Sequence, residues 1–229
     1  MSEQYIEIVG GNVQFVNKSV EREIPVEQFL AHLELTMSVD TGILPKNCFY
    51  MMREEDRFLY AVELPASVKK VVWLNKHNGE RTVHMISIPY TQFYIQAKNS
   101  GMIGSMFLSC TKQPITNLND PLFVAPYPNI HDRGTGRVCT GSMRVPQNAP
   151  LGAKINSIVS TFFEADFNRD LTPQVLSCLV DEVGGDREKY LPAWEAKTRE
   201  DRFFAISDAV EYRELETNVQ DLVKRLVRF

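Results

Sequence analysis

A thiol and a nearby amide are the side chains of this chain best suited to chemistry. Cys139 lies in the segment Gly136–Gly141 (Gly-Arg-Val-Cys-Thr-Gly), and Asn129 lies ten residues earlier in Tyr127–His131 (Tyr-Pro-Asn-Ile-His). A thiol is the most nucleophilic side chain near neutral pH, and an asparagine amide can donate hydrogen bonds to a developing oxyanion. The prolines and glycines constrain this loop more than an ordinary surface turn requires. The pattern therefore predicts a site of chemistry around Cys139.

Each of these residues also has a purely structural interpretation. Free cysteine is often buried as a small apolar residue, and Val138 suits packing beside Cys139 as well as catalysis. An asparagine that follows a proline commonly forms a turn in which its side chain bonds its own backbone. His131 and Asp132 could orient or deprotonate an incoming amine, or could simply be solvated. For each residue both interpretations stay open.

The composition is that of a globular protein. The chain has 229 residues, of which 44% are hydrophobic and 24% charged, so it can hold one large domain or two small ones. Its 25 basic and 29 acidic residues give a net charge of -4, and no long run of lysine or arginine occurs. Direct binding to nucleic acid is therefore not expected.

The first residues and the cysteines favour a location in the reducing cytoplasm. Residues 1–4 lack the basic start and apolar core of a signal peptide, and no run of about 18 apolar residues could span a membrane. The wide spacing of the cysteines argues against a zinc ribbon and against a disulfide-dense scaffold, and no cysteines or histidines are paired at the spacing of metal ligands. The four cysteines are Cys48, Cys110, Cys139 and Cys178. No Gly-Lys-Ser/Thr follows the loop glycines, so no phosphate loop is expected.

The first half of the chain is expected to form a hairpin, a helix and a sheet. Alternating apolar residues predict two short strands joined by the turn Gly10–Asn12, and apolar residues at helical spacing predict a helix over Ile24–Leu33. Further strands are expected at Phe58–Leu64, Lys69–Leu74, Val83–Pro89, Gln92–Ala97 and Met106–Cys110. Short turns between them indicate an antiparallel meander rather than parallel β-α-β units.

The chain after the loop Pro114–Pro150 is expected to be helical. One helix would carry its apolar face from Ile155 to Phe163, with Phe163 and Phe167 one turn apart toward the sheet. Further helices are expected after a Thr172 cap, over Glu195–Phe204, and over Asp208–Arg228. The last one could pack within the molecule or serve dimerisation or docking. The fold class is therefore predicted to be α+β.

A helix, an antiparallel meander, a Pro-Asn turn before Gly-x-Val-Cys, and C-terminal helices resemble the ubiquitin-conjugating (UBC) fold. In that family a His-Pro-Asn turn precedes a Gly-x-Ile-Cys segment whose cysteine carries ubiquitin as a thioester. Pro128–Ile130 and Gly136–Cys139 stand at the equivalent places here, with Tyr127 where the family has histidine. The loop between Asn129 and Cys139 is longer than is usual in eukaryotic members.

The sequence resembles more closely the bacterial UBC-like proteins called PRTRC system protein B, or prokaryotic UBC family D. The shared pattern is Ala-Pro-aromatic-x-Asn at residues 125–129, Gly-x-Val-Cys-x-Gly at 136–141, Pro146, and Phe-Phe-x-x-x-Phe at 162–167. The match is specific over Leu122–Asp170 and looser across the strands before it. Asn168 stands where this family commonly shows a histidine, so it could only hydrogen-bond there.

We expect three parts: residues 1–47 as an N-terminal hairpin and helix, 48–182 as the UBC-like core, and 183–229 as a C-terminal helical extension packed on the core. The first and last parts contribute little to the resemblance, which bears on function. The resemblance implies a carrier that accepts a ubiquitin-like protein on Cys139, with Asn129 as oxyanion donor, and transfers it onward. The implied partners are a ubiquitin-like protein and a ThiF-like activating enzyme, with no cofactor on this chain. A catalytically inactive adaptor that binds one of these partners is the alternative, so enzymatic activity stays open. An unrelated α+β protein with an accidental motif is a third interpretation.

Overall fold

The chain forms two compact units, residues 1–42 and 43–229. The computed structural model describes residues 4–9, 12–17, 20–28, 44–54, 56–98, 100–131, 136–140, 148–171 and 176–227. In the described part of the N-terminal unit, β1 (Gln4–Val9), β2 (Asn12–Asn17) and β3 (Val20–Pro25) form an antiparallel sheet in that order. The β1–β2 hairpin was predicted, whereas β3 was not. Of the helix predicted over Ile24–Leu33, residues 26–28 are helical, Ile24 and Pro25 belong to β3, and the rest lies outside the described residues.

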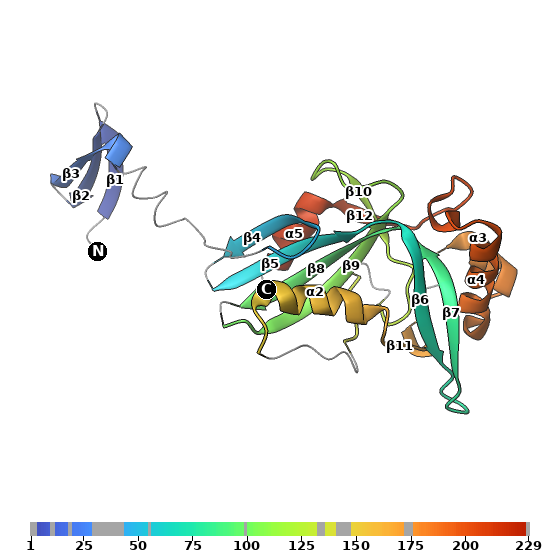
Figure 1. Cartoon of the computed structure of the whole chain (residues 1–229). Helices are drawn as coiled ribbons and strands as arrows, with labels where there is room; N and C mark the ends of the chain where they lie inside the picture. The colour runs from blue at the N-terminus through green and yellow to red at the C-terminus, as the bar shows by residue number, and fades with distance from the viewer. Residues whose placement is uncertain are drawn as a thin grey trace. The chain divides into compact units, whose positions relative to one another are not determined.

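The C-terminal unit is built on a curled antiparallel sheet (Figure 1). In its described part the main sheet has the order β12-β10-β9-β8-β5-β4. The strands are β4 (Cys48–Glu54), β5 (Arg57–Leu64), β8 (Tyr90–Lys98), β9 (Ile103–Thr111), β10 (Pro121–Val124) and β12 (Glu214–Asn218). A smaller sheet of order β11-β6-β7 contains β6 (Ser67–Leu74), β7 (Arg81–Ile88) and β11 (Asp166–Phe167). The predicted α+β class with an antiparallel sheet is confirmed.

Four α-helices are described in this unit. They are α2 (Leu151–Phe162), α3 (Ser177–Val183), α4 (Tyr190–Glu200) and α5 (Val219–Val227). Short 3-10 turns lie at Arg169–Leu171, Arg187–Lys189 and Phe204–Ile206. No helix in the described ranges has the length and apolar composition needed to cross a membrane. The three-part division of the chain at residues 47 and 182 stays a prediction.

The two sheets share one long bent hairpin. Leu64 of β5 lies opposite Thr91 of β8, and Ser67 of β6 lies opposite Ile88 of β7, so one register runs through both pairs. Pro65 and Pro89 separate the halves, and a proline cannot donate to the ladder. The ribbon therefore bends at these prolines, and β6–β7 leaves the main sheet as an arm (Figure 1).

The main sheet is covered on both faces. Alternating side chains of β8 point to opposite sides: the Phe93 ring packs 5.6 Å from the Phe162 ring of α2, whereas Tyr94 packs in the cluster beneath α5. That cluster also contains Leu59, Ala61, Phe107, Leu122, Val124, Leu215, Val219, Leu222, Val223 and Leu226. Burial of each large side chain contributes about 1.5–3 kcal/mol, so both helices are strongly held.

Several predicted helix bounds were wrong. In the segment predicted as a helix over Asp208–Arg228, residues 208–213 form no helix or strand, β12 then pairs with β10, and only after it does α5 begin. The open edge of β10 needs a strand partner, and this tertiary requirement overrides the helical spacing. α3 begins at Ser177 with Leu176 at its N-cap, while Thr172 lies outside the described residues.

The third aromatic of the Phe-Phe-x-x-x-Phe pattern is also not helical. α2 ends at Phe162, and Phe167 lies in β11, where it pairs with Trp73 of β6. The prediction that Phe163 and Phe167 lie one helical turn apart is therefore wrong. All three phenylalanines are nevertheless buried, as expected of core residues.

The cysteine loop continues the sheet beside β9. β10 pairs with β9 at Ser109 and Cys110, and beyond this point the Leu108 N–H donates to Gly136 O and the Val138 N–H donates to Met106 O, both at 2.8 Å. Gly136 has φ +65°, and a Cβ added there would lie 1.9 Å from Leu108 O. Only glycine lets the loop approach β9 so closely.

Substitution of Gly136 tests this approach. We expect Gly136→Ala to lower the free energy of unfolding by at least about 3 kcal/mol, because the added carbon meets backbone rather than a movable side chain. Gly79→Ala is the matched control, since Gly79 has φ +73° with nothing within 4 Å, and should lose only about 1–2 kcal/mol. Urea unfolding measures both; equal losses would contradict the close approach.

Helix α4 packs on β7 through hydrogen bonds as well as apolar contact. His84 Nδ1 lies 2.9 Å from Glu195 Oε2, the Met85 N–H donates to Glu195 Oε1 at 3.3 Å, and the Ser87 N–H donates to Thr198 Oγ1 at 2.9 Å. Partial burial alone would raise the pKa of Glu195, but the bonds with His84, Met85 and Arg199 outweigh it, and the pKa lies below its usual value. The ionised carboxylate therefore stabilises the folded state.

This coupling predicts a pH dependence. Because the folded pKa of Glu195 is lowered, its contribution is present above the unfolded value of about 4.3 and is lost as the pH falls through the folded pKa. We expect Glu195→Gln to be less stable than wild type by about 1–2 kcal/mol near pH 7, with the two converging under acid. Urea unfolding between pH 3 and pH 7 measures this. Glu200→Gln, at an exposed position, is the control, and a pH-independent difference for Glu195→Gln would contradict the coupling.

Candidate functional site

Cys139 lies at an exposed end of the loop that pairs with β9. Arg137 and Cys139 are exposed, whereas Val138 between them is buried. The Cys139 N–H donates to Asn129 O at 2.8 Å, and Ile130 and Val138 form an antiparallel bridge. The fold thus brings the two predicted site residues, ten positions apart in sequence, directly together through their backbones.

Asn129 has a conformation and a side-chain bond that fit a structural role. Its φ of 65° is left-handed, a region that asparagine tolerates better than most residues. Its Nδ2 donates to Asp166 O at 3.0 Å, and its own N–H donates to Leu171 O at 2.7 Å. The side chain thereby ties the loop to β11. An amide nitrogen carries two hydrogens, so one donor bond of Nδ2 accounts for only one of them.

Tyr127 occupies the core where the resembled family has histidine. Its ring stacks on Trp194 with centroids 6.0 Å apart and meets the Phe163 ring edge-on at 5.3 Å. Its hydroxyl lies 2.6 Å from Thr91 Oγ1, which itself donates to Pro89 O. Burial raises the pKa of Tyr127 well above its usual value, so the phenol stays neutral and positions the loop rather than transferring protons.

Exposure distinguishes Cys139 from the other three thiols. Cys110 is fully buried, and burial raises its pKa well above the usual value. Cys48 and Cys178 are half-buried, and partial burial raises the pKa of each. Since the thiolate is the nucleophilic form, these three are poor candidates for chemistry.

The neighbouring polar residues offer less. His131 is exposed, and its N–H donates to Arg137 O at 2.8 Å. Asp132 lies outside the described residues. Asn168 Oδ1 accepts from the Asp170 N–H at 2.9 Å, so it takes part in a local turn. Among the residues that the structure describes, no cluster of three or more His, Cys, Asp or Glu side chains could hold a metal ion.

A groove of about 460 Å³ adjoins the cysteine loop. It lies between α5 and the loop, and Gln96, Ser105, Phe107, Arg137, Leu222, Arg225 and Leu226 line it. Arg137 of the loop and Phe107 of β9 are opposite each other in an antiparallel β-bridge, so their side chains lie on the same side of the sheet. Alternation along an extended segment puts Cys139 on the side of Arg137. The groove therefore reaches the cysteine loop at Arg137, two residues before Cys139.

Sequence inspection missed the residues of this groove. Arg225 and the apolar residues of α5 lie far along the chain from Cys139, and only the packing of α5 on the sheet brings them near Arg137. Asp166, whose carbonyl holds Asn129, was likewise not predicted. Neither set has a local spacing that would have identified it.

Comparison with known proteins identifies the family. The family model described as prokaryotic E2 family D matches residues 30–203, which include the cysteine loop and most of the C-terminal unit. No curated protein and no solved structure matches the chain. E2 denotes the ubiquitin-conjugating class, and the α+β fold with its curled antiparallel sheet is consistent with the UBC fold. The chain therefore belongs to prokaryotic E2 family D and is a ubiquitin-conjugating-like protein.

Proposed function

We propose that Cys139 carries a ubiquitin-like protein as a thioester and transfers it to an acceptor amine. The observation that carries this proposal is the exposure of this one thiol of the four, on a loop whose backbone is bonded to β9 and to Asn129. A carrier needs a nucleophile that two successive partners can reach and that stays in one place between the encounters. Membership in an E2 family supports the same chemistry.

The reaction consists of two acyl transfers. In the first, the Cys139 thiol loses its proton and Sγ attacks the thioester carbonyl carbon on an activating enzyme. A C–S bond forms on Cys139 as the enzyme's thiolate leaves and takes up a proton. In the second, an acceptor amine attacks the same carbon, a C–N bond forms, and the Cys139 thiolate leaves and takes the amine's proton. ATP is consumed by the activating enzyme, which the family resemblance suggests is ThiF-like, and this chain needs no cofactor.

The groove beside the loop supports the carrier role. A protein attached to Cys139 through its C-terminal carbonyl must lay its last residues next to the thiol. The apolar floor formed by Phe107 and Leu222, with Arg137 at the thiol end, offers room for such a tail.

An inactive adaptor is the competing function, and one observation favours it. The Asn129 amide already donates to Asp166 O, and its left-handed backbone suits a turn. On this interpretation the loop keeps its shape for packing, and the protein binds a ubiquitin-like protein or an activating enzyme without forming a thioester.

Reconstitution distinguishes the two functions. The protein is mixed with ATP and with a candidate ThiF-like activating enzyme and a candidate ubiquitin-like protein from the same genome, and intact mass is measured with and without reductant. We expect a reductant-sensitive adduct that is absent in Cys139→Ala and becomes a reductant-resistant ester in Cys139→Ser. Cys178→Ser is the matched control and should load normally. No adduct, despite a charged activating enzyme and measurable binding, would favour the adaptor.

Paired substitutions at Asn129 separate positioning from catalysis. Asn129→Gly removes the side-chain amide but still adopts the left-handed backbone easily. Asn129→Ala removes the amide and also disfavours the left-handed backbone, so it should be less stable than the glycine variant by about 1 kcal/mol. If the second amide hydrogen stabilises the oxyanion, we expect both variants to transfer on the order of 100-fold more slowly. Single-turnover discharge to free lysine measures the rate. Near-normal transfer by Asn129→Gly would show that Asn129 acts only on loop shape.

A further inference from the structure

Among the described residues, the β6 strand has an unpaired edge before the two residues that pair with β11. Its partner β11 pairs with Val72 and Trp73 only, and β4 pairs with β5 rather than with β6. Ser67–Val71 therefore has a strand partner on the β7 side alone in the described part of the chain. Five residues span about 17 Å, an ordinary strand length.

The register shows which backbone groups face this edge. In an antiparallel ladder, two opposite residues either bond each other or both point away. The Met85 and Ser87 N–H groups point away from β6, because they donate to Glu195 and Thr198 of α4. Their opposite residues are Lys70 and Val68. The N–H and C=O groups of Val68 and Lys70 consequently face the free edge, in line with Val72, which bonds β11.

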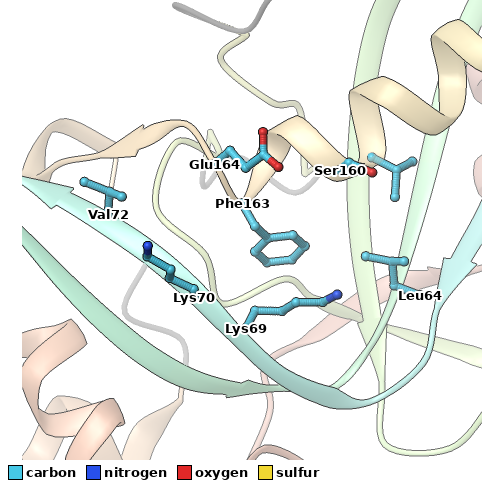
Figure 2. Close-up of a pocket in the computed structure, with 8 residues that line it drawn as sticks. Leu64, Lys69, Lys70, Val72, Ser160, Phe163 and Glu164 are labelled. Carbon is cyan, nitrogen blue, oxygen red and sulfur yellow. The ribbon is translucent and has the colours of Figure 1, made fainter.

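This edge borders a groove with a volume of about 650 Å³. Figure 2 shows the groove between β6 and the end of α2, with the Phe163 ring directed into it. Leu64, Val72 and Phe163 supply apolar surface, and Lys69, Lys70 and Glu164 supply charge. No described residue forms an ion pair with either lysine. The groove thus combines free backbone groups, an apolar floor and an excess of one positive charge.

We propose that this groove binds an extended acidic segment of a partner protein by β-strand addition along β6. Backbone donors and acceptors in strand register select an extended chain. The apolar floor accepts alternate side chains, and the two lysine ammonium groups favour carboxylates on the segment. β11 shows that this same edge already accepts a strand. The site uses none of the groups proposed to act with Cys139, so it does not depend on thioester chemistry.

Two labelled peptides test the proposal on the full-length Cys139→Ala protein. The first alternates valine with aspartate or glutamate over six residues, and the second replaces each acid by lysine. We expect the acidic peptide to bind at least tenfold more tightly by fluorescence polarisation. In NMR hydrogen exchange it should slow the Val68 and Lys70 amides at least tenfold, while the amides of Lys69 and Val71, already in the β6–β7 ladder, change little.

Three variants complete the test. Lys69→Glu combined with Lys70→Glu should reverse the peptide preference, whereas Lys98→Glu, the same charge change on the exposed end of β8, should not. Val68→Pro removes an edge-facing N–H without breaking the β6–β7 ladder, and should lose binding at least fivefold while keeping the circular dichroism spectrum. Failure of the acidic peptide to bind, protection elsewhere than Val68 and Lys70, or indifference to charge reversal would each overturn the proposal.

Discussion

The geometry around Cys139 depends on a backbone contact between Gly136 and Leu108. This contact lets the loop take over the edge of β9 where β10 ends, and the pairing sets the alternation that buries Val138 and exposes Cys139. A side chain at residue 136 would collide with the Leu108 carbonyl, so the path of the loop requires glycine. The rigidity of the site thus comes from main-chain bonds to the central sheet.

A second layer of support comes from the aromatic core beneath the loop. Tyr127 links Thr91 of β8, Phe163 after α2, and Trp194 of α4. Since Asn129 follows two residues later and bonds the segment after α2, the loop is held between the sheet and the helices on both sides. The Pro-Asn turn is therefore tied at one end to the core and at the other to the backbone of Cys139.

The bent hairpin separates the two surfaces for which we propose a function. Its β5–β8 half forms the sheet that carries the cysteine loop, and its β6–β7 half leaves that sheet at Pro65 and Pro89. α4 covers the outward-facing amides of β7, whereas part of the β6 edge beside α2 has no strand partner among the described residues. The arm therefore presents backbone groups for recognition at a place that the proposed chemistry does not use.

The sequence by itself determined the α+β class, the strands from β5 to β9 and the burial of the phenylalanines, and it singled out Asn129 and Cys139 as candidate site residues. These follow from local periodicity, from turn residues and from a short family pattern. Only the tertiary structure decided that residues 214–218 form a strand, that Phe167 leaves the helix, and that Arg225 lies near Arg137. The physical reason is that an open strand edge or a sheet face can pair with a segment from anywhere along the chain. The local spacing of residues therefore does not predict which segment that is.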